Sequence, residues 1–322
     1  MTEPKPLKSH ASYPQQLDIL RARGLLVQDE AAALAALARL GYYRLSGYFY
    51  PLRKTLPPGQ TGRQNDFCEG ASIELVLALA EFDKRLRLLT LYALESTELA
   101  VRVAVAHHLG KFDAEAHLNP RLLDGRFIQP KRPGQPSAHD LWLRRHDQLL
   151  ADSKEDFVIH HKERYGGRLP IWVAIEVWDF GTLSRFFSGM AYRDRNRVAS
   201  LLGATDGEVL KSWLRAFNFV RNVSAHHGRL WNRRNIETVA LPKLEQCRWL
   251  APLHGQPDAR SKLFGTLSCM LVMMRTIAPH SDWPARLKAH LQTFPTSELL
   301  SLSAAGFPAD WEALPLWPTP KP

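Results

Sequence analysis

The feature that most limits what this chain can fold into is an apolar periodicity over residues 73–111. Apolar residues such as Leu75, Leu79 and Phe82 recur at intervals of three and four, which is the spacing of one face of an α-helix. The segment predicts one long helix, or two helices joined near residues 96–97. No segment of any length alternates between apolar and polar residues as a strand would. The sequence therefore predicts a mainly α fold.

Shorter helical patterns lie on both sides of this segment. Ser12 and Asp29 are of residue types that cap helix N-termini, and Gly41 stands where a left-handed C-terminal cap is expected. These positions predict a small helical hairpin at the N-terminus. Further helices are predicted over residues 138–165, 182–191, 207–226 and 260–277, with a separate apolar segment from 170 to 181.

These patterns divide the chain into three predicted parts. Residues 1–60 form the helical hairpin and an aromatic-rich connector, residues 61–290 form one α-helical domain, and residues 291–322 form a Pro-rich tail.

The charge of the chain favours a polyanionic partner. Lysine and arginine total 42 against 32 aspartate and glutamate residues, which gives a formal net charge of +10. Arginine outnumbers lysine by about two to one, and the guanidinium group matches phosphate geometry with two parallel hydrogen bonds. We therefore expect a nucleic-acid partner; the alternative is that the charge serves only solubility.

Cysteine usage and hydropathy indicate a cytoplasmic protein. Cys68, Cys247 and Cys269 are far apart and form no CxxC pair, so neither a disulfide framework nor a zinc ribbon is expected. The N-terminus lacks an apolar signal core, and no segment approaches the ~18 apolar residues of a membrane span. We expect no association with a membrane.

The strongest candidate for a functional site is the segment FNFVRNVSAHHGRLWNRR, residues 217–234. Asn222 and His226 are four residues apart and fall on one helical face, with Arg221 a quarter turn away. An Arg followed by a His after four to six residues is by itself an unspecific pattern. The choice among such pairs therefore depends on the chemistry of the residues between the Arg and the His. The structural alternative is that the two histidines simply end the helix and have no catalytic role. Three other pairs have similar spacing: Arg102–His107, Arg248–His254 and Arg275–His280.

Several arginines follow the two histidines. If the helix continues past Gly228, Arg229 and Arg233 share a face with Asn222 and His226; if Gly228 ends the helix, they fan out from its C-terminus. In either case one surface holds an amide, an imidazole and several guanidinium groups.

These residue types could cleave RNA without a metal. Imidazole titrates near neutrality and can act as general base or acid on the ribose 2′-hydroxyl or the leaving 5′-oxygen. Arginine can stabilise the phosphate charge, and an amide can orient its neighbours. We therefore assign Arg221, Asn222 and His226 as catalytic. We expect no metal and no cofactor, because adjacent histidines diverge and no carboxylate or cysteine lies nearby.

One such set provides a single acid–base group, although cleavage needs two. A second set, brought by a two-fold homodimer, would supply the partner. His227 would otherwise complete the pair within one chain. Such a reaction leaves a 2′,3′-cyclic phosphate and spares DNA, which has no 2′-hydroxyl.

The segment RNVSAHHGRLWNRR resembles the signature of the Abi-like (AbiD/AbiF type) proteins, bacterial abortive-infection factors with a HEPN-type domain. The resemblance covers most of the chain and implies a HEPN-like helical bundle whose motif, here Arg221, Asn222 and His226, carries metal-independent RNase activity. It also implies pairing of motifs across a dimer and, for some members, a small non-coding RNA as partner. Some HEPN domains only bind RNA or a protein. Three further segments agree in order: RARGLLVQDEAAALAALARLGYYRLSGYFYPLR, FDKRLRLLTLYALESTELAVRVAVAHHLG and LPIWVAIEVWDFGTLSRFFSGM.

Residues of the long helix could support the site. Glu98 and Arg102 are four residues apart and predict an ion pair, either structural or supporting. His107 either packs in the core or lines a pocket. Glu176 and Asp179 either orient the motif or form a charge pair at a helix end.

The aromatic segment 42–50 has two interpretations. With Arg44 and Tyr48 it could be a platform on which RNA bases stack, or a hinge that packs the N-terminal hairpin on the bundle. The basic segment 121–134 also has two interpretations: a solvated loop or an RNA clamp.

The resulting hypothesis is an endoribonuclease of an abortive-infection or toxin-like system. The alternatives are a non-catalytic RNA-binding protein that scaffolds a small non-coding RNA, and a regulator of a partner toxin. The residues assigned to RNA binding are His227, Arg229, Arg233, Arg234, Arg44 and Tyr48.

Overall fold

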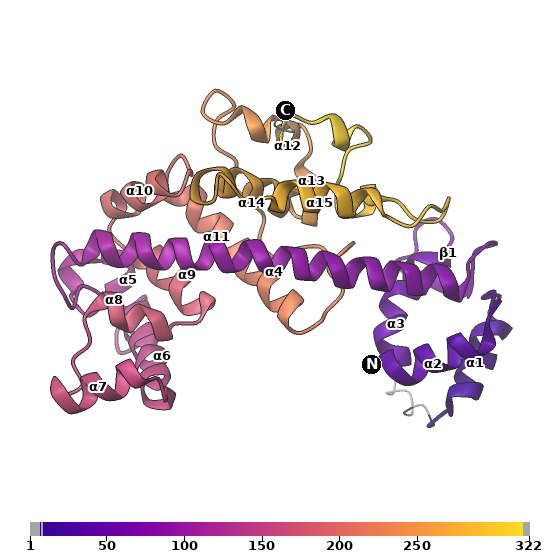
Figure 1. Cartoon of the computed structure of the whole chain (residues 1–322), viewed down its shortest axis with the longest axis horizontal. Helices are drawn as coiled ribbons and strands as arrows, with labels where there is room; N and C mark the ends of the chain where they lie inside the picture. Colours follow the sequence, from indigo (N-terminus) through magenta and orange to yellow (C-terminus); the bar gives the residue numbers. More distant parts are fainter. Residues whose placement is uncertain (1–6, 8, 318–322) are drawn as a thin grey trace. The chain divides into compact units, whose positions relative to one another are not determined.

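The computed structural model describes residue 7 and residues 9–317 (Figure 1). Fifteen α-helices and two short strands make this part of the chain mainly α, with 61% of residues helical, so the predicted fold class is confirmed. Short 3-10 turns join several helices. The α-helices are α1 (Tyr13–Ala22), α2 (Glu30–Leu40), α3 (Tyr42–Phe49), α4 (Ile73–Leu109), α5 (Gly125–Ile128), α6 (Ala138–Asp152), α7 (Asp156–Arg164), α8 (Ile171–Ala174), α9 (Phe180–Gly189), α10 (Tyr192–Leu201), α11 (Gly207–Ala225), α12 (Ala251–His254), α13 (Pro257–Arg260), α14 (Leu263–Ile277) and α15 (Trp283–Gln292); the strands are β1 (Arg53–Thr55) and β2 (Arg63–Phe67).

The described residues fall into two compact units. Unit 1 takes in the residues up to Leu86 together with His290–Ala304, and unit 2 takes in Arg87–Ala289 together with the residues from Ala305 onward. Helices α4 and α15 each contribute residues to both units. The three parts predicted from the sequence, 1–60, 61–290 and 291–322, remain predictions of domain organisation.

The helical hairpin of unit 1 forms as its capping residues predict. The Ser12 hydroxyl accepts a hydrogen bond from the Gln15 N–H, and the Asp29 carboxylate accepts one from the Ala32 N–H. Gly41 ends α2 with a φ of 78°, a conformation that costs glycine little because it has no Cβ. Helices α1 and α2 pack against each other, and α2 contacts α3.

A small antiparallel sheet in unit 1 was not predicted from the sequence. β1 and β2 pair so that Arg53 lies opposite Phe67 and Thr55 lies opposite Arg63. The strands are 3 and 5 residues long and mostly polar, so they are too short to show an alternating pattern.

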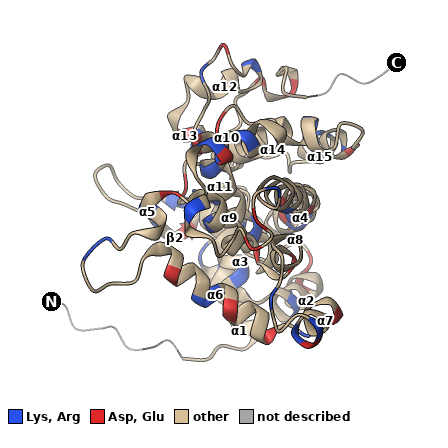
Figure 2. Cartoon of the chain, turned by 90° about the vertical axis from the view of Figure 1, so that its left-hand side faces the viewer, with Lys and Arg blue, Asp and Glu red and all other residues tan. Residues whose placement is uncertain are grey.

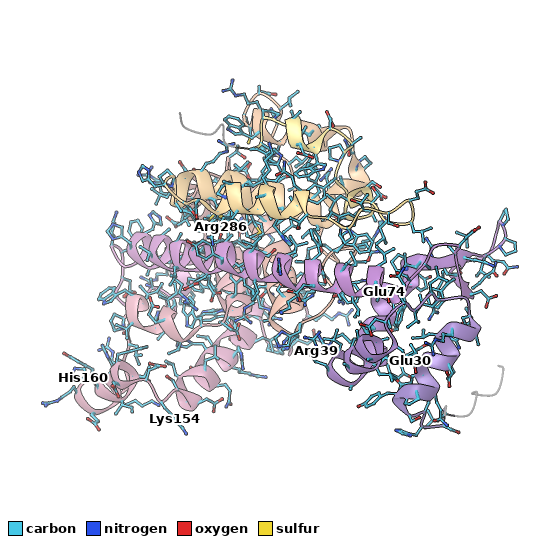
Figure 3. The ribbon with its side chains drawn as sticks, turned by 45° about the vertical axis from the view of Figure 1, so that its right-hand side comes forward. Glu30, Arg39, Glu74, Lys154, His160 and Arg286 are labelled. Atoms are coloured by element: carbon cyan, nitrogen blue, oxygen red, sulfur yellow. The ribbon has the colours of Figure 1, made fainter. Side chains whose placement is uncertain are left out.

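Helix α4 is continuous over 37 residues, so the long apolar segment forms one helix and not two. In unit 2, α15 lies beside α4 (Figures 1 and 2). The indole N–H of Trp283 donates to the Leu89 carbonyl at 2.7 Å. Figure 3 labels Arg286, whose guanidinium carbon lies 4.5 Å from the centre of the Tyr92 ring.

Helix α11 lies at the centre of unit 2. It packs against α9, α10 and α14, and 10 of its 19 residues are buried. The single helix predicted over residues 138–165 is wrong: Ser153 adopts an extended conformation that ends α6, and α7 begins three residues later.

A cluster of buried histidines and tryptophans packs α6 into unit 2. The indole N–H of Trp178 donates to Nδ1 of His146 at 2.9 Å, and the ring of Trp142 stacks on His146 with 5.2 Å between centroids. His117 contacts His146 and Trp178 edge-on. Burial lowers the pKa of His146 to about 4, and burial together with the nearby His146 lowers the pKa of His117 to about 3. Both imidazoles are therefore held neutral in the core.

Candidate functional site

The candidate motif lies in the last two turns of α11 and just beyond it. The helix begins where the Asp206 carboxylate accepts hydrogen bonds from the N–H groups of Glu208 and Val209. Its apolar stripe, which includes Trp213 and Phe217, is buried and fixes how the helix is rotated about its axis. This rotation places the polar residues of the motif away from the core.

The helix ends at the two histidines. His226 is the C-terminal cap, the His227 N–H donates to the Ser224 carbonyl at 3.0 Å, and the Gly228 N–H donates to the Val223 carbonyl at 2.8 Å. This pattern is a Schellman motif, whose left-handed position is usually glycine. Here His227 occupies it, with a φ of 57°. Of the two predicted geometries, the one in which the helix ends and the arginines fan out is therefore correct.

The left-handed backbone at residue 227 predicts a measurable strain. An L-residue with a Cβ pays about 1 kcal/mol in this region, and glycine does not. The variants His227→Gly and His227→Ala both remove the imidazole and whatever it contacts. We expect His227→Gly to unfold with about 1 kcal/mol more free energy than His227→Ala in urea titrations. Equal stabilities would mean that residue 227 relaxes out of the left-handed conformation.

Asn222 and His226 line one groove, as their spacing predicts. Both side chains are exposed, and the groove has a volume of about 1060 Å³. Helices α9 and α11 and the segment after α11 form its walls. Oδ1 of the Asn222 side chain accepts a hydrogen bond from Nη1 of Arg221 at 3.3 Å, so this amide helps to position the guanidinium group.

Arginines surround the groove. Arg185, Arg215 and Arg233 line it and are exposed, while one carboxylate among its lining residues, Glu237, lies 4.0 Å from Arg215. Nη1 of Arg233 lies close to Gly228, and its guanidinium carbon lies 5.6 Å from the centre of the Phe219 ring. The groove therefore combines positive charge with an aromatic ring.

Two of these arginines were missed in the sequence. Arg215 precedes Asn222 by two helical turns and shares its face, so helical spacing could have identified it. Arg185 comes from α9, and no spacing within the motif indicates it.

Arg221 is not among the residues that line the groove and lies near an acidic residue of α4, Glu98. Oε1 of Glu98 lies 2.7 Å from Nη2 of Arg102, which also donates to the Trp178 carbonyl at 2.7 Å. Burial raises the pKa of Glu98, and the charges of Arg102 and then Arg221 oppose that rise. The structure thus brings the predicted supporting pair together with Arg221.

Asp179 contributes to the same region of charge. Burial raises the pKa of its carboxyl, but hydrogen bonds from Arg145 and from Thr182 outweigh burial, so its pKa is lowered. Asp179 is the N-terminal cap of α9. Its negative charge is also one of the influences that raise the pKa of Glu98.

The remaining predicted residues do not all reach the groove. His107 is exposed and lines a separate cavity of about 420 Å³ together with Arg102 and Glu176. Arg234 pairs with Asp258 at 2.8 Å, and Arg229 is half-buried just after Gly228.

The aromatic segment of unit 1 corrects one assignment. Arg44 is exposed, but Tyr48 is buried, and its hydroxyl donates to Oδ2 of Asp83 at 2.7 Å. A ring packed in this way has no free face for a base, so Tyr48 belongs to the core of unit 1 and the stacking role is wrong for it.

The described residues carry neither a cluster of metal ligands nor a membrane-spanning helix. Within them, no group of three or more His, Cys, Asp or Glu side chains is placed to hold a metal ion. None of the helices in the described ranges is long and apolar enough to cross a membrane.

Comparison with known proteins defines the chain further. It is a mainly α protein with an arginine-lined groove at the end of its central helix. The model of the Abi-like protein family matches residues 35–232, and the chain belongs to that family, which is associated with abortive infection in phage defence. The matched region contains Arg221, Asn222 and His226. No curated protein and no solved structure matches the chain.

Proposed function

We propose that this protein is a metal-independent endoribonuclease of a phage-defence system, and that the groove at the end of α11 is its active site. His226 acts as the general acid or base, Arg221 stabilises charge on the phosphate, and Asn222 holds Arg221 in place. The observation that carries the proposal is that Asn222 and His226 open into one groove lined by three arginines.

The chemistry of the groove suits an RNA strand. Guanidinium groups of Arg185, Arg215 and Arg233 can each bind a phosphate oxygen pair, and the Phe219 ring offers a surface for a base. A protein that depends on such contacts binds RNA more weakly as salt is raised. The imidazole of His226 can then take the proton from a 2′-hydroxyl or give one to the 5′-oxygen.

The reaction needs a second acid–base group. We propose that a second copy of the chain supplies it in a homodimer, as the resemblance to HEPN-type proteins implies. Wild-type chains mixed with His226→Ala chains in rising proportion test this idea. If each site needs the imidazole of both chains, a mixed dimer should be inactive, so activity should fall with the square of the wild-type fraction; a fall in simple proportion to that fraction would contradict a site built from two chains.

The nature of the product tests the proposed reaction. Purified wild-type protein is incubated in EDTA with an RNA and with the same strand carrying one 2′-deoxy residue at each mapped cut. We expect 2′,3′-cyclic phosphate ends from the RNA and no cut at the deoxy positions, because the attacking hydroxyl is missing there. Cleavage that requires a divalent metal, or that leaves 3′-hydroxyl ends, would contradict the mechanism.

The arginine lining also supports a second candidate, a non-catalytic protein that scaffolds a small non-coding RNA. Binding without cleavage by wild-type protein, weakened in steps as Arg185, Arg215 and Arg233 are replaced, would favour it over the nuclease. The slope of log affinity against log salt should then fall by about one for each phosphate contact removed.

A further inference from the structure

A second cavity of unit 2 lies where the end of α4 meets α10. It has a volume of about 680 Å³, in the range of small-molecule sites, and its lining residues are distinct from those of the groove at His226. Figure 2 shows basic and acidic positions interspersed on α10. The proposed nuclease site makes no use of this cavity.

The α10 wall of the cavity presents hydrogen-bond donors. Arg193 and Arg197 are exposed, four residues apart on one face of the helix, which puts their Cβ atoms roughly 6 Å apart. Within the described part of the chain, neither guanidinium group forms an ion pair. Asn196 lies between them, and its carbonyl oxygen already accepts the Gly207 N–H at 2.8 Å. Its side-chain NH₂ group adds a further donor to this wall.

The one carboxylate among the lining side chains is already engaged. Oδ1 of Asp194 lies 2.8 Å from Nε2 of His108, and the two side chains are only 18% and 13% exposed. Because the guanidinium groups of Arg193 and Arg197 outnumber this one carboxylate, the lining carries a net positive charge and offers a ligand mainly donors. Such a lining favours an anion with several oxygens, of which phosphate is the best match for two guanidinium groups.

The segment just after α4 adds an aromatic ring to the cavity. Phe112 is 59% exposed, lies against the edge of His108 with 5.5 Å between centroids, and lines the cavity with Leu122. An exposed ring beside a phosphate-binding wall is the arrangement that stacks a nucleotide base.

We propose that this cavity binds a nucleotide, with its phosphate on Arg193, Arg197 and Asn196 and its base on Phe112. The nucleotide is either free or one unit of a single-stranded RNA, because both present the same chemistry. The site would then be a second point of RNA or nucleotide contact, independent of cleavage at His226.

The test measures binding to the full-length protein in phosphate-free buffer. Calorimetry uses AMP and inorganic phosphate as probes, and fluorescence anisotropy uses a labelled adenosine hexanucleotide. The double variant Arg193→Ala/Arg197→Ala should weaken AMP or hexanucleotide binding at least about tenfold, because two charge-assisted contacts are lost. Phe112→Ala should weaken binding of the same probe but leave that of inorganic phosphate unchanged.

A charge-matched control separates this site from general basicity. Arg144→Ala/Arg164→Ala removes two exposed arginines from α6 and α7 and should bind as wild type does. His226→Ala should also bind AMP as wild type, so failure here is distinct from failure of the nuclease proposal. AMP binding that depends on Arg193 and Arg197 indicates a free nucleotide, and dependence seen only with the hexanucleotide indicates a strand. Equal losses in the two double variants, nucleotide binding that Phe112→Ala leaves unchanged, or no binding of either nucleotide probe by wild type would overturn the proposal.

Discussion

The variant His226→Ala is expected to lose about 10³-fold in the rate of RNA cleavage while its affinity for RNA changes little. General acid–base catalysis by one positioned group contributes about 10²–10⁴-fold, and alanine removes that group entirely. The His226 side chain is exposed, and the residue caps α11 through its backbone N–H, which alanine also has. Replacement by alanine therefore leaves the fold in place. The measurement compares single-turnover cleavage of a labelled RNA with its binding under the same salt.

The neighbouring histidine provides the matched control. His227→Gly also removes an imidazole, but it does so at the position whose backbone glycine tolerates best. We expect this variant to keep most of the cleavage activity if His227 only contacts RNA. Cleavage that persists in His226→Ala and disappears in His227→Gly would move the acid–base role to His227.

The second large effect is expected on stability. Between pH 7 and pH 5 the free energy of unfolding should fall by roughly 4 kcal/mol, with equal parts from His117 and His146. Both folded-state pKa values, about 3 and about 4, lie below the ordinary value of 6.5. As the pH falls below 6.5, the unfolded chain therefore takes up protons that the folded protein cannot, and unfolding is favoured. Urea titrations at a series of pH values measure the change.

A variant that cannot titrate isolates the contribution of one ring. His146→Asn keeps an acceptor for the Trp178 indole N–H but carries no proton, so its loss between pH 7 and pH 5 should be about half that of wild type. Glu98 has the opposite sign, because its raised pKa adds stability as the pH falls. Carboxyl groups with lowered pKa, such as Asp179, contribute only near and below pH 4. An unchanged loss in His146→Asn would show that other groups drive acid unfolding.

Helices with local determinants could be predicted from the sequence. The caps at Ser12 and Asp29, the glycine at 41 and the periodicity of α4 all act over a few residues. The break between α6 and α7 was not predictable in the same way, because the residues there would also allow a continuous helix. The hairpin of β1 and β2 was missed since its pairing depends on contacts and not on a pattern.

The site shows the same division between local and distant contacts. The common face of Asn222 and His226 follows from helix geometry alone. The burial of Tyr48 could not be predicted, because its hydroxyl is bound by Asp83, which lies 35 residues further along the chain. Arg185 reaches the groove from another helix for a comparable reason.

Except for Arg185, the groove residues proposed to act on RNA come from one short continuous segment of the chain. They are Arg215, Phe219, Asn222, His226 and Arg233. A single folded chain therefore presents all of these side chains together on one helix and the turn that follows it, without any contact from a second chain. Each monomer would therefore contain its half of the proposed site whether or not it is part of a dimer. Protein concentration, through the arrival of a second copy, would then decide when cleavage begins.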